Sequence, residues 1–199
     1  IDDTDHPLII KVASIQSARM QVYFIDNEDY FHRKSLLADK KGNPHKDNDE
    51  RAIFFARDVL ETVKKLRWSP DIIHCLGWIT SFVPLYIKKA YSDDPLFSDS
   101  KVIYSIYNGD LNGTFDNNIK QEVKIDGISN KDISLLEEPT YQNIEKLAID
   151  YSDGVIMGHP NIDSELKKYI EKEKLPLLDY KNQDEYIEEY AKFYEQFVD

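Results

Sequence analysis

Cysteine and long apolar runs are scarce in this chain of 199 residues. Cys75 is its only cysteine, which excludes an internal disulfide and fits a reducing compartment, so we expect a cytoplasmic protein. The longest stretch without a formally charged residue, 72–87, contains Gly77 and Pro84. Because a membrane-spanning helix needs about 20 apolar residues, we expect this stretch to form a buried strand and helix.

Basic residues are outnumbered in this chain. The 25 Lys and Arg stand against 37 Asp and Glu, which gives a formal net charge of -12. Such a charge repels nucleic-acid phosphates and anionic membranes unless a local basic patch overrides it, and the sequence contains no such patch. We therefore expect neither nucleic acid nor a membrane as a partner.

Several common catalytic motifs are missing. The chain contains no G-x-S-x-G, no P-loop and no G-x-G-x-x-G, so a serine hydrolase, a nucleoside triphosphatase and a dinucleotide-binding enzyme have no support. The five histidines are scattered, and no pair has the i, i+4 spacing that presents two imidazoles to one metal. We expect neither a metal nor another cofactor.

Strand and helix patterns alternate along the chain. Apolar runs at 8–14 and 21–25 predict a β-hairpin, and further runs predict strands at 72–75, 101–106 and 154–157. Apolar residues at helical spacing predict helices from Asn48, at 78–90 and 141–150, and after the last strand through Lys172. Asp47 followed by Glu50 is typical of a capping box at the first of these helices.

This order of elements predicts a Rossmann-like α/β fold with a doubly wound, mostly parallel sheet. Residues 30–46 lack periodicity and indicate an ordered surface loop. No internal repeat or flexible linker divides the chain, so we expect a single domain over residues 1–199. A final helix at 184–197 carries aromatic residues on one face, which favours docking on its own domain over binding a partner.

Residues 70–88 carry a specific pattern. Pro70, Asp71, His74, Trp78, Thr80, Val83, Pro84, Tyr86 and Lys88 match the stretch PDI-V-HAHDW-x-T-x-L-V-P-x-Y-L-K of bacterial glycogen synthases and plant starch synthases. Matches in the same order lie at 22–26 (VYFVD), 47–55 (DN-x-x-RF-x-FF), 101–108 (KVVYTIHN), 113–115 (QGxF) and 148–157 (ADxVxTVS). From about Val22 to about Glu165, the chain therefore resembles that family.

The resemblance implies a GT-B glucosyltransferase that moves glucose from ADP-glucose to an α-1,4-glucan such as glycogen. In this family the N-terminal domain holds the acceptor, and the C-terminal domain holds most of the nucleotide-sugar. This chain resembles the acceptor half. We expect that upstream residues carrying the family's Lys-x-Gly-Gly-Leu loop precede Ile1, and that the nucleotide-sugar half comes from another chain or from sequence that is not shown.

Three positions depart from the family pattern. Leu76 and Gly77 replace the second His and the Asp of HAHDW, and Tyr107 replaces the His of IHN. A sugar hydroxyl or a developing charge needs hydrogen-bonding groups aimed at it, and Leu76 supplies none.

Three functions therefore stay open. The chain is a family enzyme that is incomplete by itself, a non-catalytic glucan-binding or regulatory module that partners a complete synthase, or an interaction subunit that uses its aromatic C-terminal helix, with a second copy as a further possible partner.

The resemblance also supplies candidate substrate-binding residues, namely Asp47, Asn48, His74, Trp78, Tyr107 and Asn108. His74 is the one weak catalytic candidate, although a histidine at a strand end is equally typical of a buried structural residue. Asp47 and Asn48 can line the acceptor cleft or simply cap a helix. Trp78, Tyr107 and Asn108 can offer a sugar ring a stacking surface and a polar contact, although the sequence favours Trp78 as a core residue.

Overall fold

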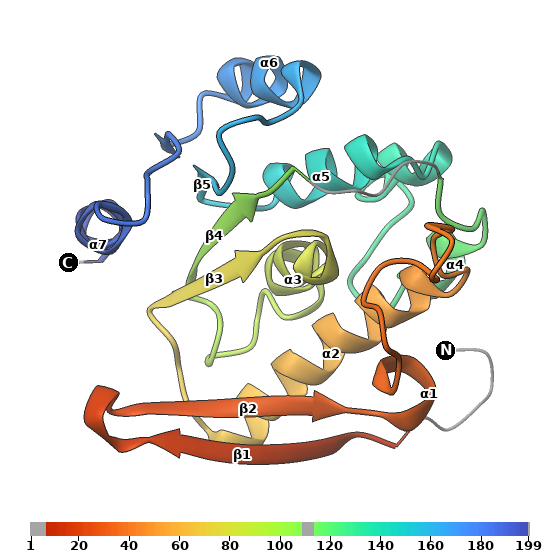
Figure 1. Ribbon diagram of the computed structural model, residues 1–199, viewed down its shortest axis with the longest axis horizontal. Helices are drawn as coiled ribbons and strands as arrows, with labels where there is room; N and C mark the ends of the chain where they lie inside the picture. The colour runs from red at the N-terminus through yellow and green to blue at the C-terminus, as the bar shows by residue number, and fades with distance from the viewer. Residues whose placement is uncertain (1–6, 109–113, 199) are drawn as a thin grey trace.

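The computed structural model describes residues 7–108 and 114–198. Its centre is a parallel sheet in the order β3 (Ile72–Leu76), β4 (Lys101–Ile106), β5 (Gly154–Met157) and β6 (Leu177–Leu178). An antiparallel hairpin of β1 (Ile9–Ile15) and β2 (Met20–Asp26) lies apart from this sheet (Figure 1). The predicted α/β fold with a parallel sheet and an early hairpin is confirmed.

Helices and turns connect the strands. The α-helices are α1 (Glu28–Phe31), α2 (Asn48–Leu66), α3 (Val83–Leu85), α4 (Ile119–Glu122), α5 (Tyr141–Asp150), α6 (Ser164–Glu173) and α7 (Tyr186–Tyr194). Short 3₁₀ turns lie at Gln16–Ala18, Trp78–Thr80 and Ser134–Glu137, and a π-helical turn lies at Tyr86–Ala90. The predicted α2, α5, α6 and α7 are all present.

The two faces of the parallel sheet are covered differently. On one face, α2, α3 and α5 pack on alternate strand residues such as Val102 and Tyr104, which belong to the main hydrophobic core. On the other face, Ile103 and Ile156 form a small cluster with Phe193 of α7. Because successive side chains of a strand point to opposite faces, β4 contributes to both layers. Figure 1 shows α7 alone on its side of the sheet.

The predicted helix over 78–90 is interrupted once, between the 3₁₀ turn at Trp78–Thr80 and a helical stretch that runs through Val83–Leu85 into Tyr86–Ala90. Gly77, at a φ of 69°, precedes the 3₁₀ turn, and Pro84 stands in the first turn of α3. Since proline has no backbone N–H to donate, it suits the start of a helix and disrupts its interior. The sequence prediction of one continuous helix is therefore wrong.

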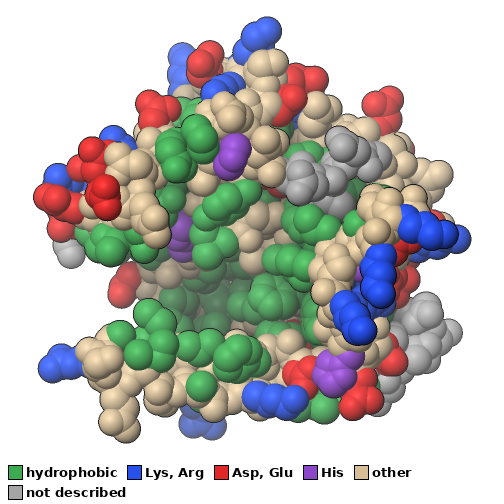
Figure 2. Space-filling view, viewed as in Figure 1, with side chains coloured by type: hydrophobic (Ala, Val, Ile, Leu, Met, Phe, Trp, Pro, Cys, Tyr) green, Lys and Arg blue, Asp and Glu red, His purple; other side chains and the backbone are tan. Residues whose placement is uncertain are grey.

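The hairpin leaves large apolar side chains in contact with solvent. Their residues are Ile9, Val12, Ile15, Met20 and Phe24. Figure 2 shows a hollow between the hairpin and the remainder of the molecule, lined largely by hydrophobic side chains. Within residues 7–108 and 114–198, no helix is long and apolar enough to cross a membrane.

Candidate functional site

The carboxyl end of the parallel sheet is the first place to look for a site, because ligands of open α/β sheets collect there. Tyr107 follows β4 directly and lies against two glycines. A Cβ added to Gly158 would stand 2.6 Å from the Tyr107 ring, and one added to Gly77 would stand 3.6 Å from it. The Tyr141 hydroxyl donates to the Tyr107 carbonyl over 3.0 Å. Tyr107 is thus a fixed aromatic ring at this edge, 38% exposed.

His74 lies in the middle of β3, on the face that α7 covers. Its Nε2 is 2.6 Å from Oγ of Ser105, and its Nδ1 is 2.7 Å from the hydroxyl of Tyr194. The rings of Tyr190 and Tyr194 stand edge-on to the imidazole. Burial lowers the pKa of His74 to about 4, so the ring is neutral at pH 7. Both nitrogens of this catalytic candidate are therefore already bonded within the chain.

Asp47 does not cap α2 as the sequence predicted. The helix has no side-chain cap bond at this position, because the Asp47 carboxylate forms an ion pair with Arg33. Although burial acts to raise it, the pKa of Asp47 lies below its ordinary value because of the Arg33 guanidinium. The carboxylate is a quarter exposed.

Asn48 is buried beneath the loop that precedes α2. Its side-chain amide donates to the carbonyl of Leu37 over 3.0 Å, and its side-chain oxygen accepts from Arg51 over 2.7 Å. Arg51 is also buried and donates to the carbonyls of Tyr30 and Leu36. These two side chains hold the loop in place, so in this conformation Asn48 is not available to a ligand.

Trp78 belongs mainly to the core. It is 8% exposed and packs against Phe115 with ring centroids 6.4 Å apart. Nearby, the backbone N–H of Asp116 donates to the carboxylate of Asp49 at the start of α2. Asn108 is exposed at the end of the first described range. The core interpretation of Trp78 is therefore the better one.

The structure divides the sequence candidates into two groups. Tyr107, Asn108 and Trp78 lie just beyond the carboxyl ends of β3 and β4, with His74 in the middle of β3, whereas Asp47 and Asn48 lie at the amino end of α2. Sequence reasoning missed Ser105 and Tyr194, the partners of His74. Tyr194 carried a signal, since its aromatic helix was expected to dock on its own domain.

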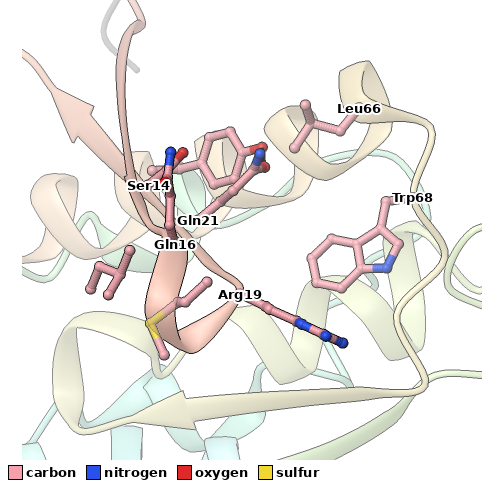
Figure 3. Close-up of a pocket in the computed structure, with 9 residues that line it drawn as sticks. Ser14, Gln16, Arg19, Gln21, Leu66 and Trp68 are labelled. Atoms are coloured by element: carbon pink, nitrogen blue, oxygen red, sulfur yellow. Dashed lines mark hydrogen bonds between the residues drawn. The ribbon is translucent and has the colours of Figure 1, made fainter.

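An open cleft of ≈ 790 Å³ lies elsewhere, between the hairpin and the end of α2 (Figure 3). Arg19 of the hairpin turn and Trp68 of the segment after α2 both line it. Trp68 comes shortly before β3 begins, so this cleft is at the amino end of the sheet, away from the edge where ligands of such sheets bind. In the described parts of the chain, no group of three or more His, Cys, Asp or Glu is placed to hold a metal ion.

Comparison with known sequences gives a consistent result. Residues 2–177 match the protein family described as starch synthase catalytic domain. The glycogen synthase of Chlorobium phaeobacteroides is 43% identical over 102 residues, which are 51% of this chain and 21% of that protein. The glycogen synthase of Clostridium perfringens is 34% identical over 148 residues, 73% of this chain and 29% of that protein. The chain thus spans between a fifth and a third of the length of these curated relatives.

Comparison with solved structures points to the same fold. The catalytic domain of starch synthase IV from Arabidopsis thaliana, bound to ADP and acarbose, superimposes with a TM-score of 0.66. The superposition covers 93% of this chain and 39% of that one, at 19% sequence identity. At this identity the likeness shows a shared fold.

Proposed function

The chain belongs to the family of starch synthase catalytic domains, and on that premise we propose that it binds an α-1,4-glucan at the carboxyl end of its sheet without transferring glucose by itself. Tyr107 and Asn108 are the residues that meet the glucan first, because both are exposed at this edge. A flat sugar face packs well on a rigid aromatic ring.

The observation that carries this proposal is the chemistry around His74. Transfer of a glucosyl group needs hydrogen-bonding groups aimed at the reacting centre. Here the neighbouring positions are Leu76 and Gly77, and both nitrogens of His74 are bonded to Ser105 and Tyr194. An edge with these residues suits binding better than glucosyl transfer.

Glucosyl transfer is the second candidate function, and family membership favours it. In this case ADP-glucose is the donor, and a complete synthase, a second copy of the chain or further sequence supplies the nucleotide-sugar half. The starch synthase IV domain that shares the fold binds ADP and acarbose. A non-catalytic glucan-binding partner of a complete synthase is consistent with the same residues around His74 and needs no nucleotide-sugar half.

The aromatic C-terminal helix gives less support to a purely interacting subunit. Phe193 and Tyr194 of α7 are turned toward their own sheet, where they contact Ile103 and His74. Ile187 is 70% exposed and is the most exposed large apolar side chain of the helix. The docking face of α7 is therefore occupied within the chain.

Glucan binding is tested by affinity electrophoresis in gels that contain glycogen, supported by calorimetric titration with maltoheptaose. We expect the parent chain to be retarded by glycogen and Tyr107→Ala to lose most of that retardation. Trp68→Ala is the matched control, because it removes an exposed aromatic ring at the opposite end of the sheet. Equal retardation of both variants would contradict binding at Tyr107.

Glucosyl transfer is tested by incorporation of labelled glucose from ADP-glucose into glycogen, with a complete synthase as the positive control. We expect no incorporation by this chain alone. Incorporation that His74→Ala abolishes would instead establish a glucosyltransferase.

A further inference from the structure

A hydroxyl group of the chain itself occupies the hydrogen-bonding position beside His74. The phenol of Tyr194 is 2.7 Å from Nδ1, while Ser105 takes the other ring nitrogen. A sugar hydroxyl offers an imidazole the same chemistry, one O–H donor and one oxygen acceptor. Tyr194 thus fills the place that a glucan hydroxyl would need in order to reach His74.

Two tyrosines of α7, Tyr190 and Tyr194, lie beside the covered histidine. Burial raises the pKa of Tyr194 to about 12, and the neighbouring Tyr190 and Tyr107 add to the shift. Burial also raises the pKa of Tyr190, and the electrostatic effect of Tyr107 acts in the same direction. The rings of Tyr190 and Tyr194 lie edge-on to the imidazole of His74, so the tyrosines of α7 cover the histidine while Tyr107 stays exposed.

The attachment of α7 is slight. Within this helix, which the structure describes in full, Phe193 is the one buried residue. Nine residues are too few for a stable helix in water without tertiary packing, since isolated helices below about 12–15 residues are marginal. The helix therefore depends on a small set of contacts with the sheet.

Those contacts converge on a glycine of β5. A Cβ at Gly154 would stand 2.6 Å from the Phe197 ring and 3.2 Å from the Phe193 ring. Both aromatic rings thus rest directly on the backbone of the strand. An added methyl group at this position would have to displace the ends of these two rings, which weakens the contacts of the α7 segment with the sheet and leaves His74, Tyr194 and Tyr107 unchanged.

From this geometry we propose that α7 is a removable cover over His74, which competes with the glucan and makes binding at this edge tighter when it is displaced. The inference rests on the proposed glucan-binding function and adds the regulation of that site. In the covered state, glucan contacts the exposed edge at Tyr107 and Asn108 without reaching His74. Displacement of α7 adds the imidazole of His74 as a second contact.

The test compares Gly154→Ala, Tyr194→Phe and the parent chain for binding of maltoheptaose by calorimetry. Tyr194→Phe keeps the ring and removes one net hydrogen bond, so we expect roughly fivefold tighter binding. Gly154→Ala crowds the ends of the two rings that anchor the segment, and we expect a gain in the same direction, because apparent affinity scales with the fraction of open molecules. Ile187→Ala changes an exposed side chain of α7 and should leave binding unchanged.

Nuclear magnetic resonance of the His74 ring reports the cover independently of glucan. In the parent chain the ring stays neutral down to a pKa of about 4, whereas displacement of α7 should move its titration toward the ordinary value of a histidine. The groups that face the ring are Ser105, Tyr190 and Tyr194, none of which titrates in this range.

The outcomes are distinct. Tighter binding by the two variants supports the cover. Equal binding by the parent and by a variant whose His74 titration has moved overturns it and leaves glucan binding intact. Absence of binding in all three chains overturns the proposed function and, with it, the inference.

Discussion

Compared with the face of the sheet under α2, α3 and α5, the face under α7 is held by few side chains. The first face joins Val102, Tyr104 and Leu147 to the main core, whereas on the second face the buried cluster consists, among residues 7–108 and 114–198, of Ile103, Ile156 and Phe193. Hydrophobic stabilisation scales with the apolar area removed from water. The face under α2, α3 and α5 therefore supplies most of the stability. On the other face, α7 can detach beside the candidate site at a small cost in free energy.

We call the face under α2, α3 and α5 the deep face and the face under α7 the thin face. The largest effect is expected from a cavity on the deep face. Phe82 is completely buried in the main core. We expect Phe82→Ala to lower the free energy of unfolding by about 3–5 kcal/mol, through lost transfer energy and the cavity that remains. Urea denaturation followed by circular dichroism measures it. A loss comparable to that of a surface variant would contradict the assignment of stability to this face.

A buried acid gives the deep face its own pH dependence. Glu145 of α5 is fully buried, and neither carboxyl oxygen has a hydrogen bond of ordinary geometry. Burial raises its pKa to about 7, against the opposing effect of the hydroxyls of Tyr104 and Tyr141. The folded chain therefore holds a proton that the unfolded chain releases near pH 4.5.

Stability from Glu145 is therefore fully present below pH 4.5 and is lost as the pH rises to about 7. We expect Glu145→Gln to remove a decline of about 3 kcal/mol in the free energy of unfolding across this interval. Denaturation at pH 4.5 and at pH 8, parent against variant, isolates this group. An unchanged pH profile in Glu145→Gln would show that Glu145 titrates normally.

The matched cavity on the thin face should cost less. Phe193→Ala removes the anchor of α7, but the loss cannot exceed the free energy that docks the helix, because the rest of the domain stays folded. We expect a loss of about 2 kcal/mol, and hydrogen exchange that speeds up in α7 while it stays slow in β4. Equal acceleration in both elements would mean that the two faces unfold together.

The smallest effect belongs to one hydrogen bond of the thin face. Tyr194→Phe removes the hydroxyl that meets Nδ1 of His74. We expect a loss of about 1 kcal/mol in the docking of α7, the net worth of an ordinary hydrogen bond. Hydrogen exchange of the α7 amides measures it, and Tyr186→Phe is the control, because Tyr186 is exposed on the same helix.

The strands and long helices were largely predictable because their signals are local. The prediction of strands at 101–106 and 154–157 and of a helix at 141–150 coincides with β4, β5 and α5. Two further elements could not be predicted in this way. The two residues of β6 form a strand only because they pair with Val155 and Ile156. The broken helix after Gly77 depends on backbone geometry that periodicity does not report.

The candidate site was predictable only in part. His74 and Tyr107 were named from sequence, and the aromatic spacing of the last helix correctly indicated docking on its own domain. The partners of His74 are 31 and 120 residues away in sequence, at Ser105 and Tyr194. No local pattern reveals such a pairing, and likewise the ion pair of Asp47 with Arg33 replaced the helix cap that local reasoning expects.

Apolar periodicity and spaced motif residues were enough to predict most of the elements, their order and the family to which the chain belongs, because these signals are local in the sequence. The tertiary structure alone decided which side chains are available to a ligand. Availability depends on what lies across the fold: α7 covers His74, the loop before α2 covers Asn48, and Tyr107 is left exposed. Burial and hydrogen bonding are properties of neighbours in space, which residue spacing does not encode.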